Sequence, residues 1–504
     1  MASDERRLHP LSWLFAAAQV AKGFVLPAIL VLFASGDSYE LWALAFAVPV
    51  VLGAVLQYAV FRYRLADEEI VVRDGLLTRT ERHIPYARIQ NVDLVQNPLH
   101  RVLRVALVRV ETASGSKPEA VMRVLSLDAV DEMRAAVFAG RRAPAAAASR
   151  PDPQAGVLLH VPVRELVKLG TISNRGLVVV GAFAGLWWQR ARFQPDMGDW
   201  AGPLIESAID RLPAAAGGPP IVRAALAGAV LLLAAVVLLR LCSIGWYVLQ
   251  LYDFTLRRRG TDLAAAYGLL TRVSRTIPAS RVQSLRATES LLHRWFRRQS
   301  VELRTAGGGS GSNADGQLDV PAVGAAEGQW LAPLVETERV PALVESVLPG
   351  AALGSVRWQP VAPRAWRRVF VRWVALAVLP AALLAAAAGP PWLLLLVVPG
   401  GLAAAMHARL TVRNAAYALT SWGVLCRLGW WRRTLTIVRY ARIQTVALCE
   451  SPFDRRHGMA SVRVDTAGAA AGGYTVRIPY LDREAAVAVA HRLHDEAARQ
   501  PFHW

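Results

Sequence analysis

The sequence is poor in cysteine and lacks the short motifs by which many enzymes are recognised. Its 504 residues include three cysteines, Cys242, Cys426 and Cys449, whose spacing fits neither a disulfide framework nor a metal site. It contains no HExxH or GxSxG motif, and the run GGGSGS (307–312) lacks the Lys-Ser/Thr pair of a phosphate-binding loop. His491 and His494 are most simply explained as part of a solvated helix face. We therefore expect a non-catalytic protein with no cofactor and no metal.

Charge is scarce in the long apolar segments. Six such segments occur as three pairs, at 13–34 and 41–61, 171–188 and 221–249, and 369–388 and 392–406. A membrane-spanning helix needs about 20 apolar residues, so the pairs predict three α-helical transmembrane hairpins. We expect Lys22 to be the only charge well inside a segment, which disfavours a transport pathway.

The net charge of +19 does not indicate nucleic-acid binding, because the cations gather beside the apolar segments. This is the positive-inside pattern. It predicts a multi-pass inner-membrane protein with its N-terminus, the regions between hairpins and its C-terminus in the cytoplasm. The flanking cations are Arg6, Arg7, Arg62, Arg64, Arg164, Lys168, Arg175, Arg364, Arg367, Arg368 and Arg372.

One pattern occurs three times, each time after a pair of apolar segments. Its copies are DGLLTRTERHIPYARIQNV (74–92), YGLLTRVSRTIPASRVQSL (267–285) and LGWWRRTLTIVRYARIQTV (428–446). In every copy a Gly precedes a Gln by fifteen residues, and a Thr-Ala pair begins twenty-two residues after the Gln. A fixed period indicates one structural unit used three times. The recurring positions are Gly75, Gly268 and Gly429, then Gln90, Gln283 and Gln444.

Short alternating stretches with turn signals follow each apolar pair, which predicts antiparallel strands closed by a helix. The glycine is expected at a hairpin turn with positive φ. The predicted organisation is hairpin 1 at 1–62, domain 1 at 63–142, a linker at 143–163, hairpin 2 at 164–250, domain 2 at 251–350, hairpin 3 at 364–408 and domain 3 at 409–500.

The run IPYARIQNVDLVQNPLHRVLRVALVRVETASG (84–115) closely resembles the signature of bacterial pleckstrin-homology (PH)-like domains. Three copies with paired apolar helices are similar to the YdbT-like bacterial membrane proteins, whose domains are of the YdbS-like type. RRLHP (6–10) and TISNRG (171–176) add to this resemblance. It implies that each unit is an α+β PH-like split β-barrel of about seven strands with a C-terminal helix.

Recurring arginines and two aromatic-basic clusters are the candidate binding residues. The recurring glycine and glutamine positions are more simply explained as fold determinants, whereas Arg is seldom buried without a partner. Trp favours the bilayer interface and Arg is attracted to anionic lipids. The candidates are Arg88, Arg281 and Arg442; Arg101, Arg294 and Arg455; and the clusters Trp295, Arg297, Arg298 and Trp430, Trp431, Arg432, Arg433.

The sequence thus favours a membrane-anchored binding or scaffolding protein. Its expected partners are anionic membrane lipids, another membrane protein or a smaller PH-like membrane protein. The alternatives are a component of a membrane transporter or channel, and a membrane enzyme with an unrecognised site.

Overall fold

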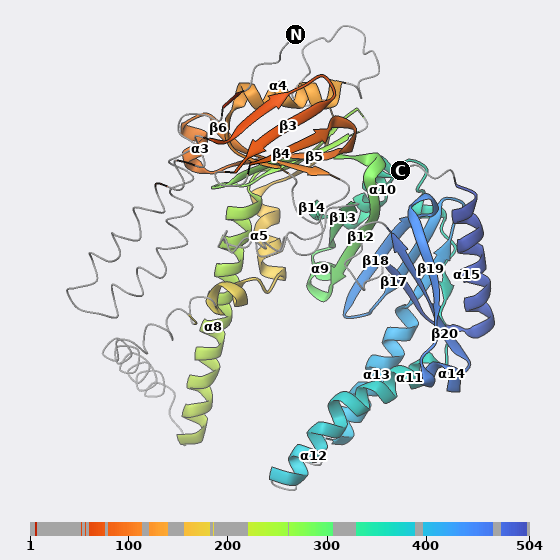
Figure 1. Cartoon of the computed structure of the whole chain (residues 1–504). Helices are drawn as coiled ribbons and strands as arrows, with labels where there is room; N and C mark the ends of the chain where they lie inside the picture. The colour runs from red at the N-terminus through yellow and green to blue at the C-terminus, as the bar shows by residue number, and fades with distance from the viewer. Residues whose placement is uncertain are drawn as a thin grey trace.

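The computed structural model describes residues 6–7, 52, 56, 60–75, 79–112, 120–139, 156–181, 185, 220–260, 262–305, 329–388, 397–466 and 475–500. Three units of one design follow each other along these residues (Figure 1). Each unit contributes four antiparallel strands to one sheet and three to the next, and it ends in a helix.

The first unit contains β1 (Arg6–Arg7), β2 (Arg62–Leu65), β3 (Glu69–Asp74), β4 (Thr80–Pro85), β5 (Ile89–Gln96), α3 (Pro98–Val102), β6 (Val105–Thr112), β7 (Ala120–Ser126) and α4 (Leu127–Ala139). A 3-10 turn, η1 (Tyr86–Arg88), separates β4 from β5. The chain thereby passes from the four-stranded layer to the three-stranded layer.

The second unit contains β8 (Val157–Val161), α5 (Val163–Ile172), α8 (Pro220–Leu251), β9 (Phe254–Arg259), β10 (Asp262–Tyr267), β11 (Arg272–Pro278), η3 (Ala279–Arg281), β12 (Val282–Ser290), α9 (Leu291–Trp295), β13 (Arg298–Thr305), β14 (Gln329–Glu336), η4 (Thr337–Arg339) and α10 (Val340–Val347). Here the same order of strands recurs, with α5 and α8 placed between β8 and β9.

The third unit begins after η5 (Leu353–Ser355). It contains β15 (Gln359–Pro360), α11 (Ala365–Trp373), the π-helical segment η6 (Val374–Val378), α12 (Leu379–Ala388), α13 (Val397–Asn414), β16 (Ala416–Leu419), β17 (Gly423–Leu428), β18 (Arg432–Arg439), η8 (Tyr440–Arg442), β19 (Ile443–Cys449), α14 (Pro452–Arg456), β20 (Met459–Thr466), β21 (Val476–Asp482) and α15 (Arg483–Ala498).

The recurring glycine occupies the turn between the third and fourth strands of each unit. Gly75, Gly268 and Gly429 have φ values of 110°, 112° and 83°, so the predicted positive φ is confirmed. A side chain could not be accommodated at Gly268, because an added Cβ would lie 2.0 Å from the carbonyl oxygen of Thr271. The glycine is therefore required by the turn itself.

A buried apolar core lies in each unit. In the first unit it contains Ile70, Val108 and Met133, and in the third unit Ile478 and Leu493, all fully buried. Burying one such side chain contributes roughly 1.5–3 kcal/mol. The terminal helices α4 and α15 each supply one face of their core, which explains their amphipathic sequences.

The prediction of three transmembrane hairpins is wrong for the part of the chain that the structure describes. By length and composition, one described helix could cross a membrane, namely Gly228–Leu251 within α8. The third predicted pair is divided into α11, η6, α12 and α13, and the C-terminal half of α13 carries His407, Arg409 and Arg413. The segments 13–34 and 41–61, including Lys22, lie outside the described residues, apart from isolated positions.

The second predicted pair also differs from expectation. Its first segment, 171–188, shares only its first two residues with α5, a short amphipathic helix whose buried face contains Leu166 and Leu169, and the described part of the rest is helical at 176–181 and 185. Arg240 lies within α8, where its guanidinium donates hydrogen bonds to the carbonyl oxygen of Ser173 (2.8 Å) and to Asn174 Oδ1 (3.0 Å). The expectation that Lys22 is the only charge well inside an apolar segment is therefore wrong.

Candidate membrane-contact site

Exposed apolar side chains occupy the turn between the third and fourth strands. Leu270 is 53% exposed in the second unit, and Trp431 is 61% exposed at the same repeat position in the third. The turn of the second unit is held against the end of α8, because Gly268 N–H donates to the carbonyl of Tyr252 and Leu269 N–H to that of Leu249. This contact places the apolar tip beside the helix that could enter a membrane.

A short helix in each unit presents a second group of exposed apolar side chains. Val102 of α3 is 79% exposed, Trp295 of α9 is 78% exposed and Phe453 of α14 is 60% exposed. Trp295 stacks on Phe296 with ring centroids 5.7 Å apart, and Phe296 packs against the core of the second unit. In Figure 1, α9 and α14 lie at the ends of their units toward which α8 and α12 extend.

The two tryptophans of the third-unit turn differ in their surroundings. Trp430 is half-buried, and its indole Nε1–H donates to Nδ1 of His407 on α13 at 3.0 Å. Trp431 lies edge-on to Trp430 and extends into solvent. Trp430 thus fixes the turn to α13, which leaves Trp431 positioned to contact another surface.

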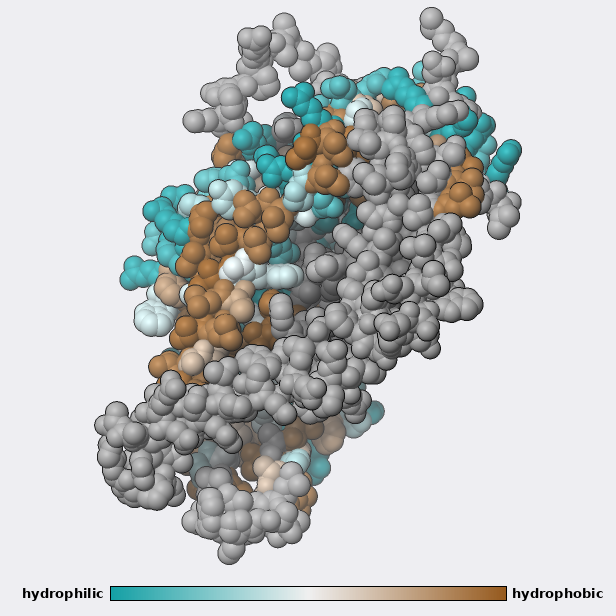
Figure 2. Space-filling view, turned by 90° about the vertical axis from the view of Figure 1, so that its left-hand side faces the viewer, coloured by the Kyte–Doolittle hydropathy of each residue, from teal (hydrophilic) through white to brown (hydrophobic). Residues whose placement is uncertain are grey.

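Exposed arginines lie beside these aromatic side chains. Arg297 follows α9, Arg432 begins β18, and Arg455 lies on α14 beside Phe453. On the face drawn in Figure 2, hydrophilic side chains gather at the upper end and hydrophobic ones form a band below them. The exposed aromatic rings and the arginines beside them are together suited to the interface of an anionic bilayer.

Two of the recurring arginines contact the neighbouring unit. Arg101 of the first unit donates to the carbonyl oxygen of Leu269 at 3.2 Å, and Arg294 of the second donates to that of Trp430 at 2.7 Å. Leu269 and Trp430 follow the recurring glycine in their own units. Each arginine therefore holds the turn of the next unit in the chain.

Two further candidate arginines, both in the third unit, also have structural partners. Arg442 donates to the carbonyl oxygen of Ser280, which joins η8 of the third unit to η3 of the second. Arg433 donates to Asn414 Oδ1 at 3.0 Å. Of the other two, Arg88 is exposed on η1 and Arg281 is partly exposed on η3. The sequence grouped these arginines together, whereas the structure divides them among several surroundings.

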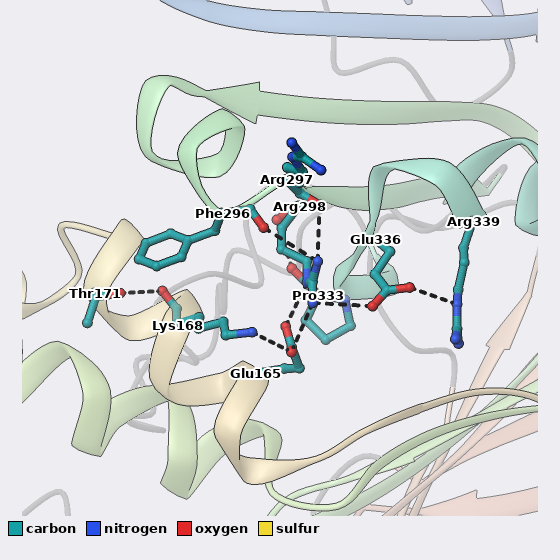
Figure 3. Close-up of polar contacts among 10 residues, drawn as sticks. Glu165, Lys168, Thr171, Phe296, Arg297, Arg298, Pro333, Glu336 and Arg339 are labelled. Carbon is teal, nitrogen blue, oxygen red and sulfur yellow. Dashed lines mark hydrogen bonds and ion pairs between the residues drawn. The ribbon is translucent and has the colours of Figure 1, made fainter.

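Arg298 fixes α5 to the second unit (Figure 3). Its Nε and Nη2 donate to the two carboxylate oxygens of Glu165 at 2.9 and 3.3 Å, and Glu336 lies 3.3 Å away. Lys168 donates to the same carboxylate at 2.8 Å. Burial alone would raise the pKa of Glu165, but these hydrogen bonds more than offset it and hold the pKa below its usual value. Glu165 was not among the residues indicated by the sequence, because it lies outside the repeated pattern.

Glycines allow α5 and the following turn to approach α8 closely. A Cβ added at Gly170 would lie 2.5 Å from the Cα of Ile244, and one added at Gly176 would lie 1.9 Å from the carbonyl oxygen of Leu239. Both glycines belong to or adjoin the TISNRG segment. The second unit is thus attached rigidly to the end of its apolar helix.

The third unit differs from the other two at one buried position. His100 and His293 occupy it in the first two units, and Asp454 occupies it in the third. His293 Nδ1 lies 2.8 Å from Ser290 Oγ, and its Nε2 lies 3.1 Å from Ser300 Oγ. Burial, with a smaller effect of Arg432, lowers the pKa of His293 to about 4. It is therefore neutral at physiological pH.

Asp454 instead forms an ion pair with Arg368 of α11 at 2.9 Å. It also caps α14, because its carboxylate accepts from Ser451 N–H while Ser451 Oγ accepts from Asp454 N–H. The guanidinium of Arg368 lies over the ring of Phe453, 4.9 Å from the centroid. Asp454, in the place of the histidine, therefore attaches α14 to α11.

The repeated strand order, the positive-φ turn and the closing helix define a class of bacterial domain, and comparison with known proteins agrees. The family model for the bacterial PH domain matches residues 17–141, 212–338 and 369–497, and the chain belongs to this family. No solved structure is matched.

Two curated relatives are known from Bacillus subtilis (strain 168). The chain is 23% identical to the UPF0699 transmembrane protein YdbT over 370 residues, which cover 69% of this chain and 70% of YdbT. It is 31% identical to the UPF0699 transmembrane protein YdbS over 80 residues, which cover 16% of this chain and 50% of YdbS. The expected resemblance to YdbT-like proteins is confirmed. Together with α8, these matches support a membrane-associated protein.

Proposed function

We propose that this protein is a non-catalytic, membrane-anchored binding platform whose PH-like units contact anionic lipids of the inner leaflet from the cytoplasmic side. The observation that carries the proposal is the exposure of Trp295, Trp431 and Phe453 beside arginines. Trp295 and Phe453 belong to α9 and α14, which lie at the ends of their units toward which the apolar helices extend (Figure 1), and Trp431 adjoins Trp430, which is hydrogen-bonded to His407 of α13. Aromatic rings favour the bilayer interface, and each nearby arginine contributes about 1 kcal/mol to the free energy of binding to an anionic surface.

Strand pairing supports the placement of all three units on one side of the membrane. In each unit, the strand before the apolar segments pairs with the strand after them, as Arg7 pairs with Arg62, Val161 with Phe254 and Pro360 with Ala416. The chain therefore returns to its starting point after each apolar region. The flanking cations favour the cytoplasm as the common side.

The polar groups within the units support a binding role over a catalytic one. His293, the most obvious candidate for proton transfer, is buried and contacts two serine hydroxyls. Ser300 Oγ donates to the carbonyl of Pro333 at 2.7 Å, so it accepts from His293 Nε2–H. This chain of hydrogen bonds satisfies the donors of His293 within the fold, which is typical of a structural residue.

Lipid contact can be measured on the full chain in nanodiscs. A bimane fluorophore would be attached at Trp295→Cys or Trp431→Cys in a Cys242→Ser, Cys449→Ser background, since Cys426 is 2% exposed. Glu345→Cys on α10 is the matched control, because in Figure 1 α10 lies at the opposite end of the second unit from α9. The quencher is a nitroxide on the lipid headgroup.

We expect quenching at positions 295 and 431 but not at 345, with at least a twofold increase when phosphatidylglycerol is added to phosphatidylcholine. High salt should reduce this increase, because the Debye length falls from about 10 Å at 0.1 M to about 3 Å at 1 M. The double variant Arg297→Gln, Arg432→Gln should also reduce this increase in quenching. Equal quenching at all three positions, or insensitivity to lipid charge, would exclude the proposed contact and favour a protein partner for this surface.

A further inference from the structure

Neighbouring units are joined edge to edge by the same pair of strands. β5 of the first unit pairs with β11 of the second, and β12 of the second pairs with β18 of the third. Leu94 lies opposite Ser274 at the first junction, and Ala287 lies opposite Leu435 at the second. These are equivalent repeat positions, since the first two copies are offset by 193 residues and the last two by 161. The junction is therefore a reproducible interface with one register.

The same side chains support both junctions. The arginine of the short helix, Arg101 or Arg294, binds the turn of the following unit in each case. At the first junction Arg275 also forms an ion pair with Asp93, 3.0 Å apart, although Asp93 is 1% exposed. At the second, Leu435 and Ile437 of β18 join the core cluster of the second unit. The interface thus combines strand pairing, polar contacts and apolar burial.

Two edges of the same kinds have no neighbouring strand among the described residues. β4, the counterpart of β11 and β18, ends the first sheet, and β19, the counterpart of β5 and β12, ends the last. Gln283 and Ser284 of β12 are 6% and 3% exposed, whereas their counterparts Gln444 and Thr445 of β19 are exposed. Leu448 is 42% exposed. The difference in burial reflects the missing partner strand, because β12 and β19 have equivalent places in their units.

The two edges are chemically complementary in the register of the existing junctions. In that register Glu450 would face Arg79 of another copy, as Glu289 faces Arg433 at the second junction. Cys449 would face Thr80, as Thr288 faces Thr434. Opposite charges placed directly across antiparallel strands stabilise the pair by roughly 0.2–1 kcal/mol, whereas like charges destabilise it.

We propose that copies of this protein associate head to tail, with β19 of one copy pairing with β4 of the next. Both halves of the interface belong to this chain, and the interface continues the geometry that already joins its units twice. Because the two surfaces differ, the contact is heterologous and can extend to a third copy or close into a ring. Arg455, the counterpart of Arg101 and Arg294, would then bind the turn that contains Gly75 of the next copy. This inference does not depend on lipid contact.

Cross-linking in native membranes tests the register directly. Thr80→Cys should react with the native Cys449 of a neighbouring copy through a short bifunctional thiol reagent, since Cβ atoms of directly opposed residues are about 4.5–5.5 Å apart. Glu81→Cys is the matched control, because its side chain projects from the opposite face of β4. We expect species of dimer mass and above with Thr80→Cys, at least tenfold more abundant than with Glu81→Cys, and joint recovery of two differently tagged copies.

Three results would overturn the proposal. If Thr80→Cys gives no more adduct than the double variant Thr80→Cys, Cys449→Ser, the two edges do not meet. An adduct that persists in that double variant would indicate pairing between like edges. A product containing a different protein, such as a single-domain PH-like protein, would show that another occupant takes the edge.

Charge reversal provides a second measurement that does not require a new cysteine at the interface. Glu450 is also 3.1 Å from Arg483 in its own chain, whereas Arg79 is exposed. Arg79→Glu and Glu450→Arg should each lower recovery of a tagged copy by an untagged one at least threefold, and the double variant should restore it. Restoration cannot result from improved folding of either single variant. Failure of the double variant to recover, with normal expression, would count against the pairing.

Discussion

The ion pair between Glu165 and Arg298 should control how firmly α5 is held on the second unit. The two side chains are 14% and 16% exposed, so their hydrogen bonds are only partly screened by solvent. Hydrogen bonds to charged groups contribute about 1.5–3 kcal/mol each, and a partly buried charge left without its partner carries an additional cost. Glu336 would still neutralise part of the charge of Arg298. We therefore expect Glu165→Gln to destabilise the attachment of α5 by about 2 kcal/mol.

Hydrogen exchange in detergent or nanodiscs measures this attachment locally. A loss of about 2 kcal/mol corresponds to roughly 30-fold faster exchange for amides of α5 that open with the helix. The core strands of the second unit should keep their protection. Glu338→Gln is the matched control, because Glu338 is exposed on the neighbouring turn η4. Lys168→Ala should have a smaller effect, since Lys168 is 34% exposed.

The pH dependence provides an independent check. The folded pKa of Glu165 is depressed, so its contribution is present above the usual value of 4.5 and is lost as the pH falls through the lower folded value. Relative to the intrinsic exchange rate at each pH, the protection of the α5 amides should fall in that range in the wild type and much less in Glu165→Gln. Unchanged exchange in Glu165→Gln at neutral pH would refute the view that this ion pair fixes α5.

Three further outcomes are expected. The free energy of unfolding should decline by up to about 3 kcal/mol as the pH falls from 6.5 to about 4. The pKa of His293 is lowered in the folded chain, so the unfolded chain takes up the proton first. If a His293→Asn variant shows the same pH profile in chemical denaturation, this explanation is contradicted. Gly268→Ala should lower the free energy of unfolding by roughly 2 kcal/mol or more. Gly260→Ala, at φ 61° with open space around it, should lower it by about 1 kcal/mol. Equal shifts of the melting temperature in the two variants would show that the close approach at the turn is unimportant. Arg294→Gln should speed amide exchange in the 429–431 turn about tenfold, as expected for loss of one charge-assisted hydrogen bond of about 1.4 kcal/mol, while the exposed Arg297→Gln should leave it unchanged.

The sequence predicted the repeated unit and its local features well. Gly75, Gly268 and Gly429 have positive φ because a tight turn imposes a backbone conformation that strongly favours glycine. Alternating apolar residues specified the strands, since one face of each strand packs on a core. The helix ends follow local sequence less closely: Asp482, which precedes α15, makes no capping hydrogen bond and instead pairs with Arg364 at 2.6 Å.

The candidate arginines show why residue type and spacing alone do not define a site. Arg294 and Arg297 are three residues apart, yet one binds the next unit and the other is exposed. Trp430 and Trp431 are adjacent, yet one is held by His407 and the other extends into solvent. Phe453 was not among the predicted site residues, although it occupies the repeat position of Leu99, which is 50% exposed. Its counterpart in the second unit, Leu292, packs against the core, so the repeats share no exposed apolar position here that the sequence could show.

By itself, the sequence determined that one strand-rich unit is used three times, because hydrophobic alternation and turn glycines are local properties of the chain. Only the tertiary structure showed that the units share sheets, that β4 and β19 remain at the edges, and that one described helix is long and apolar enough to span a membrane. Strand pairing between units joins residues far apart in sequence. Its register depends on the shape of two folded edges and on the arginines that bind across them, which no local pattern contains.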